Sequence, residues 1–434
     1  MSLLQKPVSR PFLFWLAVCV LSLTACNSTS NKDKKNSSDS LQIIELPKPV
    51  PVAAAEATRI RNASEAWYDT VLLQKGFNGG IIVAKDGNII FEKYHGTAHL
   101  SGKDTITANT SMHIASTSKT FTAMAVLKLM QEGKLNIDDE FSKYFPSFNY
   151  PGVTIRCLLS HRSGLPNYNY FMEKLGWDKT KFVTNEDVLN YLITRKAELP
   201  DINPPGIHFS YCNTNFALLA LLIEKVTGST YAAYLDKSFF IPLQMQHTYV
   251  FSLADTLKAV PSYNWKGTQE AFTFLDQVYG DKNIYTTPRD LLTWDRFLCS
   301  NLLFTPETLE QAYAPYSNEK PGMHNYGLGW RMQIFPDGNK IIYHNGWWHG
   351  SNAAFIRLLK EKATIIAIGN KFNRGVYHAK MLTSLFGNYA FPTDDEENGN
   401  QKDSLSFERP LSKKGDNILP NPKSTKKALK KQKK

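Results

Sequence analysis

Hydrophobic residues follow a strand-like pattern at both ends of the folded part of the chain. Near its start, two apolar runs, "GGIIVAK" (79–85) and "NIIFEKYHG" (88–96), flank the turn dipeptide Asp86-Gly87, which predicts a β-hairpin. A helix is expected before this hairpin, at 63–74. Apolar runs typical of strands return after residue 326; they predict strands at 326–335, 340–348, 352–359 and 363–370, then a last helix at about 376–386.

Helical patterns dominate the region between these strands. Residues 116–133 form a segment that is apolar on nearly every face and ends at Gly133, as expected for a helix buried inside the protein. Strands at both ends of a long helical middle predict one α+β unit, in which an antiparallel sheet of about five main strands is flanked by helices and joined to a mostly helical lobe. Further helices are predicted at 185–197, 214–228 and 287–298.

The first 25 residues have the features of a secretory signal peptide. Lys6 and Arg10 precede an apolar run at 11–23 that is short for a membrane-spanning helix. The following "LTAC" resembles the lipobox of bacterial lipoproteins, so Cys26 is expected to be lipidated and to become the first mature residue; an ordinary signal peptide with a chance cysteine is the alternative. We therefore expect a lipoprotein signal peptide at 1–25, a flexible tether at 26–60, a folded domain at 61–392 and a disordered basic tail at 393–434.

The net charge of +11 is concentrated at the two ends of the chain. Residues 411–434 carry a net charge of +8 and residues 1–25 carry +2, which leaves +1 for the rest. Because the folded part is nearly neutral, nucleic acid is not expected as a partner. The basic tail is expected to be a solvated arm, able to contact anionic lipid or wall polymer.

No metal or cofactor is expected. Cys157, Cys212 and Cys299 remain in the folded part, an odd number without a CxxC motif, so neither a disulfide framework nor a zinc site is indicated. His161 and His349 have no spacing that would pair them as metal ligands, and both are expected to be structural or to lie at the rim of a site.

Candidate chemistry begins at the start of the buried helical segment, where "ASTSK" places Ser116 three residues before Lys119. A serine hydroxyl needs a base within hydrogen-bond reach and donors for the developing oxyanion. A lysine one helical turn further on lies on the same face, and desolvation makes its amine a usable base. Ser-x-x-Lys also occurs at Ser317 and Ser424, so the spacing alone leaves open that Ser116 is a helix cap and Lys119 a solvated residue.

Two further motifs favour the catalytic interpretation. Tyr211-Cys-Asn213 directly precedes a hydrophobic helix, and His344-Asn-Gly346 lies late on a predicted strand. Together with Ser116-Thr-Ser-Lys119, and in this order, they resemble the three motifs of the serine β-lactamase and penicillin-binding-protein superfamily, on the side of the class C β-lactamases, DD-peptidases and esterases. The resemblance covers about residues 64–390 and makes 61–392 a β-lactamase-related catalytic domain.

The resemblance implies a role for each matching residue. Ser116 would attack an acyl carbonyl and become the acyl-enzyme ester, while Lys119 and Tyr211 would share the proton transfers; which of the two is the first base stays open. Asn213 would orient Lys119 or hold a substrate amide. The oxyanion hole would consist of the backbone N–H groups of Ser116 and Trp347.

His344 stands where classical β-lactamases and penicillin-binding proteins carry a lysine that meets the substrate carboxylate. A histidine is mostly neutral near pH 7, which predicts weaker attraction for a carboxylate and puts β-lactam hydrolysis in doubt. The resemblance thus implies a serine hydrolase of the bacterial cell envelope, lipid-anchored, acting on a small ester or a D-amino-acid peptide of the peptidoglycan type. The alternatives are a catalytically inactive or penicillin-binding envelope lipoprotein, and a β-lactamase.

Overall fold

The hairpin predicted around Asp86-Gly87 is present at the start of the main sheet. We describe the protein from a computed structural model, which covers residues 42–200, 203–319 and 321–389. Strands β1 (Gly79–Lys85) and β2 (Asn88–His95) pair antiparallel, and the two turn residues have φ values of 49° and 78°. Both values lie in the left-handed region that a two-residue hairpin of this kind requires.

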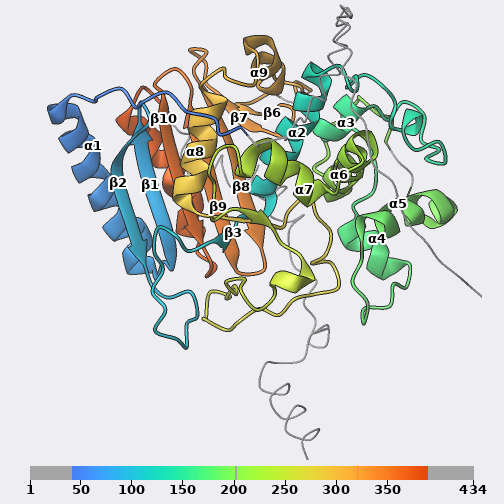
Figure 1. The fold of residues 1–434 in the computed structure, drawn as a ribbon, viewed down its shortest axis with the longest axis horizontal. Helices are drawn as coiled ribbons and strands as arrows, with labels where there is room; N and C mark the ends of the chain where they lie inside the picture. The colour runs from blue at the N-terminus through green and yellow to red at the C-terminus, as the bar shows by residue number, and fades with distance from the viewer. Residues whose placement is uncertain (1–41, 201–202, 320, 390–434) are drawn as a thin grey trace, which may run out of the picture. The chain divides into compact units, whose positions relative to one another are not determined.

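The main sheet has seven strands in the order β2-β1-β10-β9-β8-β7-β6, and every neighbouring pair is antiparallel (Figure 1). The prediction of an α+β fold with an antiparallel sheet is confirmed, although about five main strands were expected. The two additional strands are the short strand β6 at the edge of the sheet and its neighbour β7, which falls within the predicted strand at 326–335. The C-terminal strands are β6 (His324–Tyr326), β7 (Arg331–Ile334), β8 (Lys340–Trp348), β9 (Ser351–Leu358) and β10 (Ala363–Gly369).

A second sheet of three very short strands, in the order β3-β5-β4, was not predicted. Two or three residues are too few for an alternating pattern to be visible in the sequence. Its strands are β3 (Met112–His113), β4 (Tyr249–Val250) and β5 (Ile284–Thr286).

The first helix begins earlier than expected. Helix α1 spans Ala54–Trp67 and continues through the π-helical turn η1 (Tyr68–Leu72) and the 3₁₀ turn η2 (Leu73–Lys75). Residues 54–60, which we assigned to the tether, are therefore helical, because this alanine-rich stretch favours helix without showing a strong apolar face. The predicted signal peptide, the expected lipidation site Cys26 and the predicted basic tail lie outside the described residues.

The middle region of the chain consists mainly of helices. The predicted cap at Thr287 is present: its Oγ1 accepts a hydrogen bond from the Asp290 N–H at 3.0 Å. Within the described residues no single helix is long and apolar enough to cross a membrane, although Asn213–Thr227 and Tyr231–Phe240 meet that criterion as a pair bent by 74°. The helices are α3 (Ile155–Leu159), α4 (Tyr168–Lys174), α5 (Asn185–Thr194), α6 (Asn213–Thr227), α7 (Tyr231–Leu235), α8 (Pro288–Leu298) and α9 (Pro306–Ala312).

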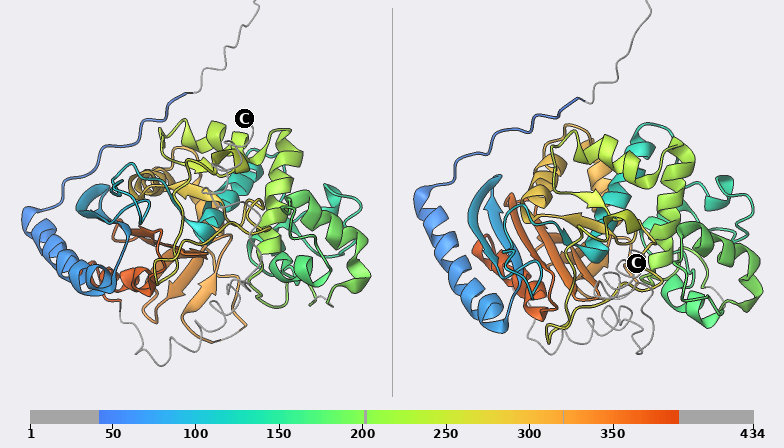
Figure 2. Two further views of the ribbon diagram at one scale, coloured as in Figure 1. Left: turned by 90° about the horizontal axis from the view of Figure 1, so that it is seen from below. Right: turned by 60° about the horizontal axis from the view of Figure 1, so that its bottom comes forward.

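The main sheet separates two hydrophobic cores. Side chains such as Ile81 and Val83 of β1 face a smaller core with α1 and the 3₁₀ segment η8 (Arg374–Leu385), which replaces the last predicted helix. Their neighbours Ile82 and Ala84 face the larger core, which contains α6, α8 and the central helix. Figure 2 shows α1 and the end of the described chain together on the side of the sheet away from the middle helices.

The central helix α2 (Lys119–Gln131) is buried along almost its whole length, as its all-round apolar pattern predicted. It is preceded by the 3₁₀ turn η3 (Ala115–Ser118), so Ser116 lies in this turn and not in the α-helix itself. Ala115 has a φ of 46°, an uncommon value for a residue other than glycine. The chain therefore turns sharply just before Ser116.

Candidate active site

Ser116 and Lys119 are in direct contact at the start of α2. The Lys119 Nζ donates to the Ser116 Oγ at 3.0 Å and to the backbone oxygen of Asp281 at 2.8 Å. Lys119 has no exposed surface, and Ser116 keeps 5% of its surface exposed. A buried amine within hydrogen-bond reach of a hydroxyl is the arrangement that activation of a nucleophile requires.

Tyr211 lies beside this pair, just before α6. The Lys119 Nζ is 5.0 Å from the centre of the Tyr211 ring, and the tyrosine is 6% exposed. On its other side the ring packs against His161, with ring centres 4.3 Å apart. The His161 Nδ1 accepts a hydrogen bond from the Cys212 N–H at 3.2 Å, and burial holds the pKa of this imidazole well below its usual value. His161 is thus a neutral, buried support for the tyrosine loop.

Asn213 is the first residue of α6 and is almost fully buried. Its Nδ2 donates to the Asn169 Oδ1 at 3.5 Å, so the structure gives it a partner other than Lys119. Among the described residues, the Asn213 Oδ1 has no hydrogen-bond partner. Since buried polar atoms are normally paired, this oxygen is a candidate acceptor for a further donor in the site.

His344 is buried on β8 with both ring nitrogens engaged. Its Nδ1 lies 2.7 Å from the Asn345 backbone oxygen, which can only accept, so the proton is on Nδ1. Its Nε2 then accepts from the Tyr326 hydroxyl at 3.2 Å. Burial, with the charges of Arg331 and Lys119, lowers the pKa of His344 well below its usual value. The imidazole is therefore neutral at pH 7, as the sequence indicated.

Gly346 lets β8 lie against the turn that carries Ser116. A Cβ at this position would be 2.0 Å from the Ile114 backbone oxygen, so a larger residue would push the two segments apart. The Gly346 carbonyl accepts from the Tyr377 hydroxyl at 3.1 Å. In a trans peptide the N–H points opposite to the C=O, so the Trp347 N–H points away from Tyr377.

Arg331, at the start of β7, was not singled out from the sequence. Its guanidinium carbon lies 4.9 Å from the centre of the Tyr211 ring and 6.0 Å from that of Tyr326. In the sequence, Arg331 could have been found as the single arginine on the predicted strand 326–335, which precedes the predicted strand that carries His344. The site therefore contains a cation that His344 itself does not provide.

Asp281 was also missed, because its contribution is a backbone oxygen that no side-chain motif reveals. The loop that ends in β5 brings this oxygen to Lys119.

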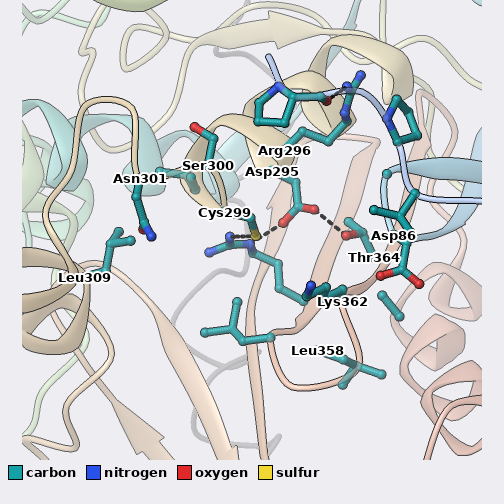
Figure 3. Close-up of a pocket in the computed structure, with 18 of the residues that line it drawn as sticks. Asp86, Asp295, Arg296, Cys299, Ser300, Asn301, Leu309, Leu358, Lys362 and Thr364 are labelled. Atoms are coloured by element: carbon teal, nitrogen blue, oxygen red, sulfur yellow. Dashed lines mark hydrogen bonds and ion pairs between the residues drawn. The ribbon is translucent and has the colours of Figure 1, made fainter.

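A cavity of about 520 Å³ lies away from all of these groups, between the end of α8 and the β9–β10 hairpin (Figure 3). Its lining includes the buried ion pair of Arg357 and Asp295, 2.5 Å apart, and none of the candidate catalytic residues.

The seven-stranded sheet, the central helix and the Ser-Lys-Tyr group together define a protein of the serine β-lactamase and penicillin-binding-protein superfamily. The chain belongs to the Beta-lactamase family, whose model matches residues 60–386. It is therefore a member of a family of serine hydrolases.

Relatives and solved structures agree with this assignment. The chain is 29% identical to penicillin-binding protein 4* of Bacillus subtilis (strain 168), over 75% of this chain and 76% of that protein. It is 28% identical to protein flp of Staphylococcus aureus (strain MRSA252), over 72% of this chain and 64% of flp. An octameric penicillin-binding protein homologue from Pyrococcus abyssi shares the fold with a TM-score of 0.64 and 23% identity, covering 74% and 76% of the two chains. A D-stereospecific amidohydrolase from Streptomyces sp. has a TM-score of 0.58 and 22% identity, covering 78% and 100%.

Proposed function

We propose that this protein hydrolyses an ester or a D-amino-acid peptide of the peptidoglycan type through a covalent acyl-enzyme on Ser116. The observation that carries the proposal is the 3.0 Å contact between the Lys119 Nζ and the Ser116 Oγ in a buried site. The ring of Tyr211 lies beside the same amine, which supports a part for this tyrosine in the proton transfers.

The steps follow from the positions of these groups. The Ser116 Oγ attacks the acyl carbonyl, and its proton passes to the unprotonated Lys119 amine, which gives a proton on to Tyr211 as the tyrosine hydroxyl protonates the leaving group. The backbone N–H groups of Ser116 and Trp347 stabilise the negative oxygen of the tetrahedral intermediate. The intermediate collapses to the Ser116 ester as the leaving group departs with a proton from Tyr211, and a water molecule then releases the acid by the reverse sequence.

Arg331 supports a substrate that carries a carboxylate. His344 is neutral, but the Arg331 guanidinium lies over the same tyrosine ring that borders the nucleophile. A guanidinium offers five N–H donors in a fork that matches a carboxylate, and so can serve more than one partner. The name of the Bacillus subtilis relative, penicillin-binding protein 4*, is in keeping with a peptide substrate of this kind.

Arg331→Gln should raise KM for an acyl-D-Ala-D-Ala peptide by about 10-fold or more, because a hydrogen bond to a charged group contributes roughly 1.5 to 3 kcal/mol. Hydrolysis of p-nitrophenyl acetate, which has no carboxylate, should change little. Arg289→Gln is the matched control, since that arginine pairs with Glu92 at the surface. Equal losses on both substrates would argue against carboxylate binding by Arg331.

The substrate class is tested with a panel on the purified mature protein. Acyl esters, D-Ala-D-Ala peptides and nitrocefin separate esterase, peptidase and β-lactamase activity. Turnover of the first or second group supports the proposal. Formation of a stable penicillin adduct without turnover of any of them would instead favour a penicillin-binding lipoprotein.

We also propose that the protein is anchored in the cell envelope through Cys26. The mature protein should carry acyl chains and enter the detergent phase of a detergent partition, whereas Cys26→Ser should remain unacylated and move to the aqueous phase. Cys19→Ser is the control, because Cys19 lies within the expected signal peptide. Membrane association that survives Cys26→Ser would point to the basic tail.

A further inference from the structure

The loop whose backbone contacts the Lys119 amine also carries a buried pair of opposite charges. Asp281 and Lys282 are 1% and 3% exposed, and the Lys282 Nζ is 3.5 Å from the Asp281 Oδ2. The Tyr168 hydroxyl donates to the same carboxylate oxygen at 2.9 Å and accepts from Lys282. The Lys282 amine also lies 4.8 Å from the centre of the Trp348 ring, at the end of β8.

The loop that carries this pair is fixed tightly between two helices. The Gly280 carbonyl accepts from the Thr122 Oγ1 of α2 at 2.6 Å, and a Cβ on Gly280 would be 2.4 Å from the Phe216 oxygen of α6. The next carbonyl along the chain, that of Asp281, accepts from Lys119 at 2.8 Å. The place of the Lys119 amine is therefore set by the same loop that buries the ion pair.

The charges of this pair lie close enough to act on Lys119. From the covalent geometry of one residue, the Asp281 carboxylate is within roughly 8 Å of the Lys119 Nζ. At that distance in a buried site, an uncompensated charge changes a pKa by about one unit or more. An opposite charge beside the carboxylate cancels most of this influence. Breaking a buried pair leaves such an uncompensated charge.

We propose that Asp281 and Lys282 are positioning residues for the general base: their loop places the Lys119 amine, and Lys282 cancels the carboxylate charge that would otherwise keep that amine protonated. This inference rests on the proposed function, in which Lys119 must accept a proton from Ser116. Neither residue touches the reacting atoms through its side chain. Their effect on the reaction is therefore expressed through Lys119.

Other ionisable groups around Lys119 must be distinguished from it in a pH profile. On the elements packed against the amine these are Tyr211, His161, His344, Cys212 and Arg331. Burial lowers the pKa of both histidines well below the usual value and raises that of the Cys212 thiol to about 11. Both histidines and the thiol are therefore uncharged near pH 7.

The ionisable groups that face the ion pair are Tyr168, Asp276, His113 and Tyr231, with His349 paired to Asp276. Burial raises the pKa of both tyrosines and lowers that of His113 to about 3, while His349 helps to lower the pKa of Asp276 to about 2. Asp276 therefore remains a second negative charge near Lys282.

Lys282→Met should move the acid limb of the kcat/KM profile for p-nitrophenyl acetate to higher pH by about one unit or more. The sign follows because an unpaired carboxylate favours the ammonium form of Lys119, so a higher pH is needed to free the base. The double variant Asp281→Asn with Lys282→Met removes both charges and should return the limb to its wild-type position. Lys282→Arg, which keeps the charge, should also leave it there.

If Lys282→Met fails to fold, Asp281→Asn gives the opposite test. The Asp276 carboxylate also favours the charged form of Lys282, so loss of the Asp281 charge should leave a net positive influence that moves the limb to lower pH. A wild-type limb in every folded single variant would overturn the inference. Ser116→Ala separates the two proposals: if it stays active, the proposed function fails, whereas its inactivity combined with an unmoved limb in the Lys282 and Asp281 variants rejects this inference alone.

Discussion

Replacing Ser116 with alanine should reduce hydrolysis of p-nitrophenyl acetate by roughly 10⁵-fold or more and abolish covalent labelling by a fluorophosphonate. The loss is this large because the acyl-enzyme cannot form without the Oγ, and the remaining groups only orient substrate and stabilise charge. The fold should survive, since Lys119 keeps its hydrogen bond to the Asp281 carbonyl. Steady-state rates and gel fluorescence of the labelled protein measure both effects.

Ser317→Ala provides the control for this variant. Ser317 is the first residue of another Ser-x-x-Lys match in the chain, but the structure places it in the loop after α9, where its N–H donates to the Asn325 Oδ1. It should retain wild-type labelling and turnover. Labelling of Ser116→Ala at the wild-type rate would show that the nucleophile is another residue.

Lys119→Met should slow acylation by about 10²- to 10⁴-fold, the usual contribution of a general base. Methionine is an unbranched apolar side chain that can fill the space of the lysine stem, but it cannot accept the serine proton. The effect should fall on the acylation step, so the burst of p-nitrophenol in a stopped-flow experiment should become slow. Thermal unfolding should show that the variant remains folded.

Lys128→Met tests whether the effect belongs to position 119. Lys128 is on the same helix, nine residues further along, and pairs with Glu132 near the surface. Its replacement should leave the burst unchanged. A normal burst in Lys119→Met would reject the lysine as the first base and leave Tyr211 in that role.

The local elements of this fold could be predicted because their signals are local. Asp86-Gly87 fixed the first hairpin, the apolar run of 340–348 matched β8, and Thr287 marked the start of α8. The order of the strands could not be predicted in the same way. The pairing of β1 with β10 joins segments more than 270 residues apart, and such pairing depends on the packing of both cores against the sheet.

The candidate site was predictable where side chains occur in motifs. Ser116, Lys119, Tyr211 and His344 lie within one region, as the order of the motifs suggested. Arg331 and Asp281 were missed because neither is part of a motif. One acts through its place on a neighbouring strand, and the other through a backbone oxygen.

Arg331 also changes what His344 implies. From the sequence, a neutral histidine in place of a lysine predicted weak attraction for a carboxylate. The His344 imidazole is indeed neutral, but the Arg331 guanidinium on the adjacent strand lies over the ring of Tyr211. Substrate choice should therefore depend on the pair of residues and not on His344 alone.

Mass spectrometry of the mature protein after reaction with a fluorophosphonate tests the central claim most directly. The intact protein should gain the mass of one adduct, and peptide mapping should place that adduct on the Ser116 hydroxyl. An unmodified protein, or an adduct on a different serine, would contradict the assignment of Ser116 as the nucleophile.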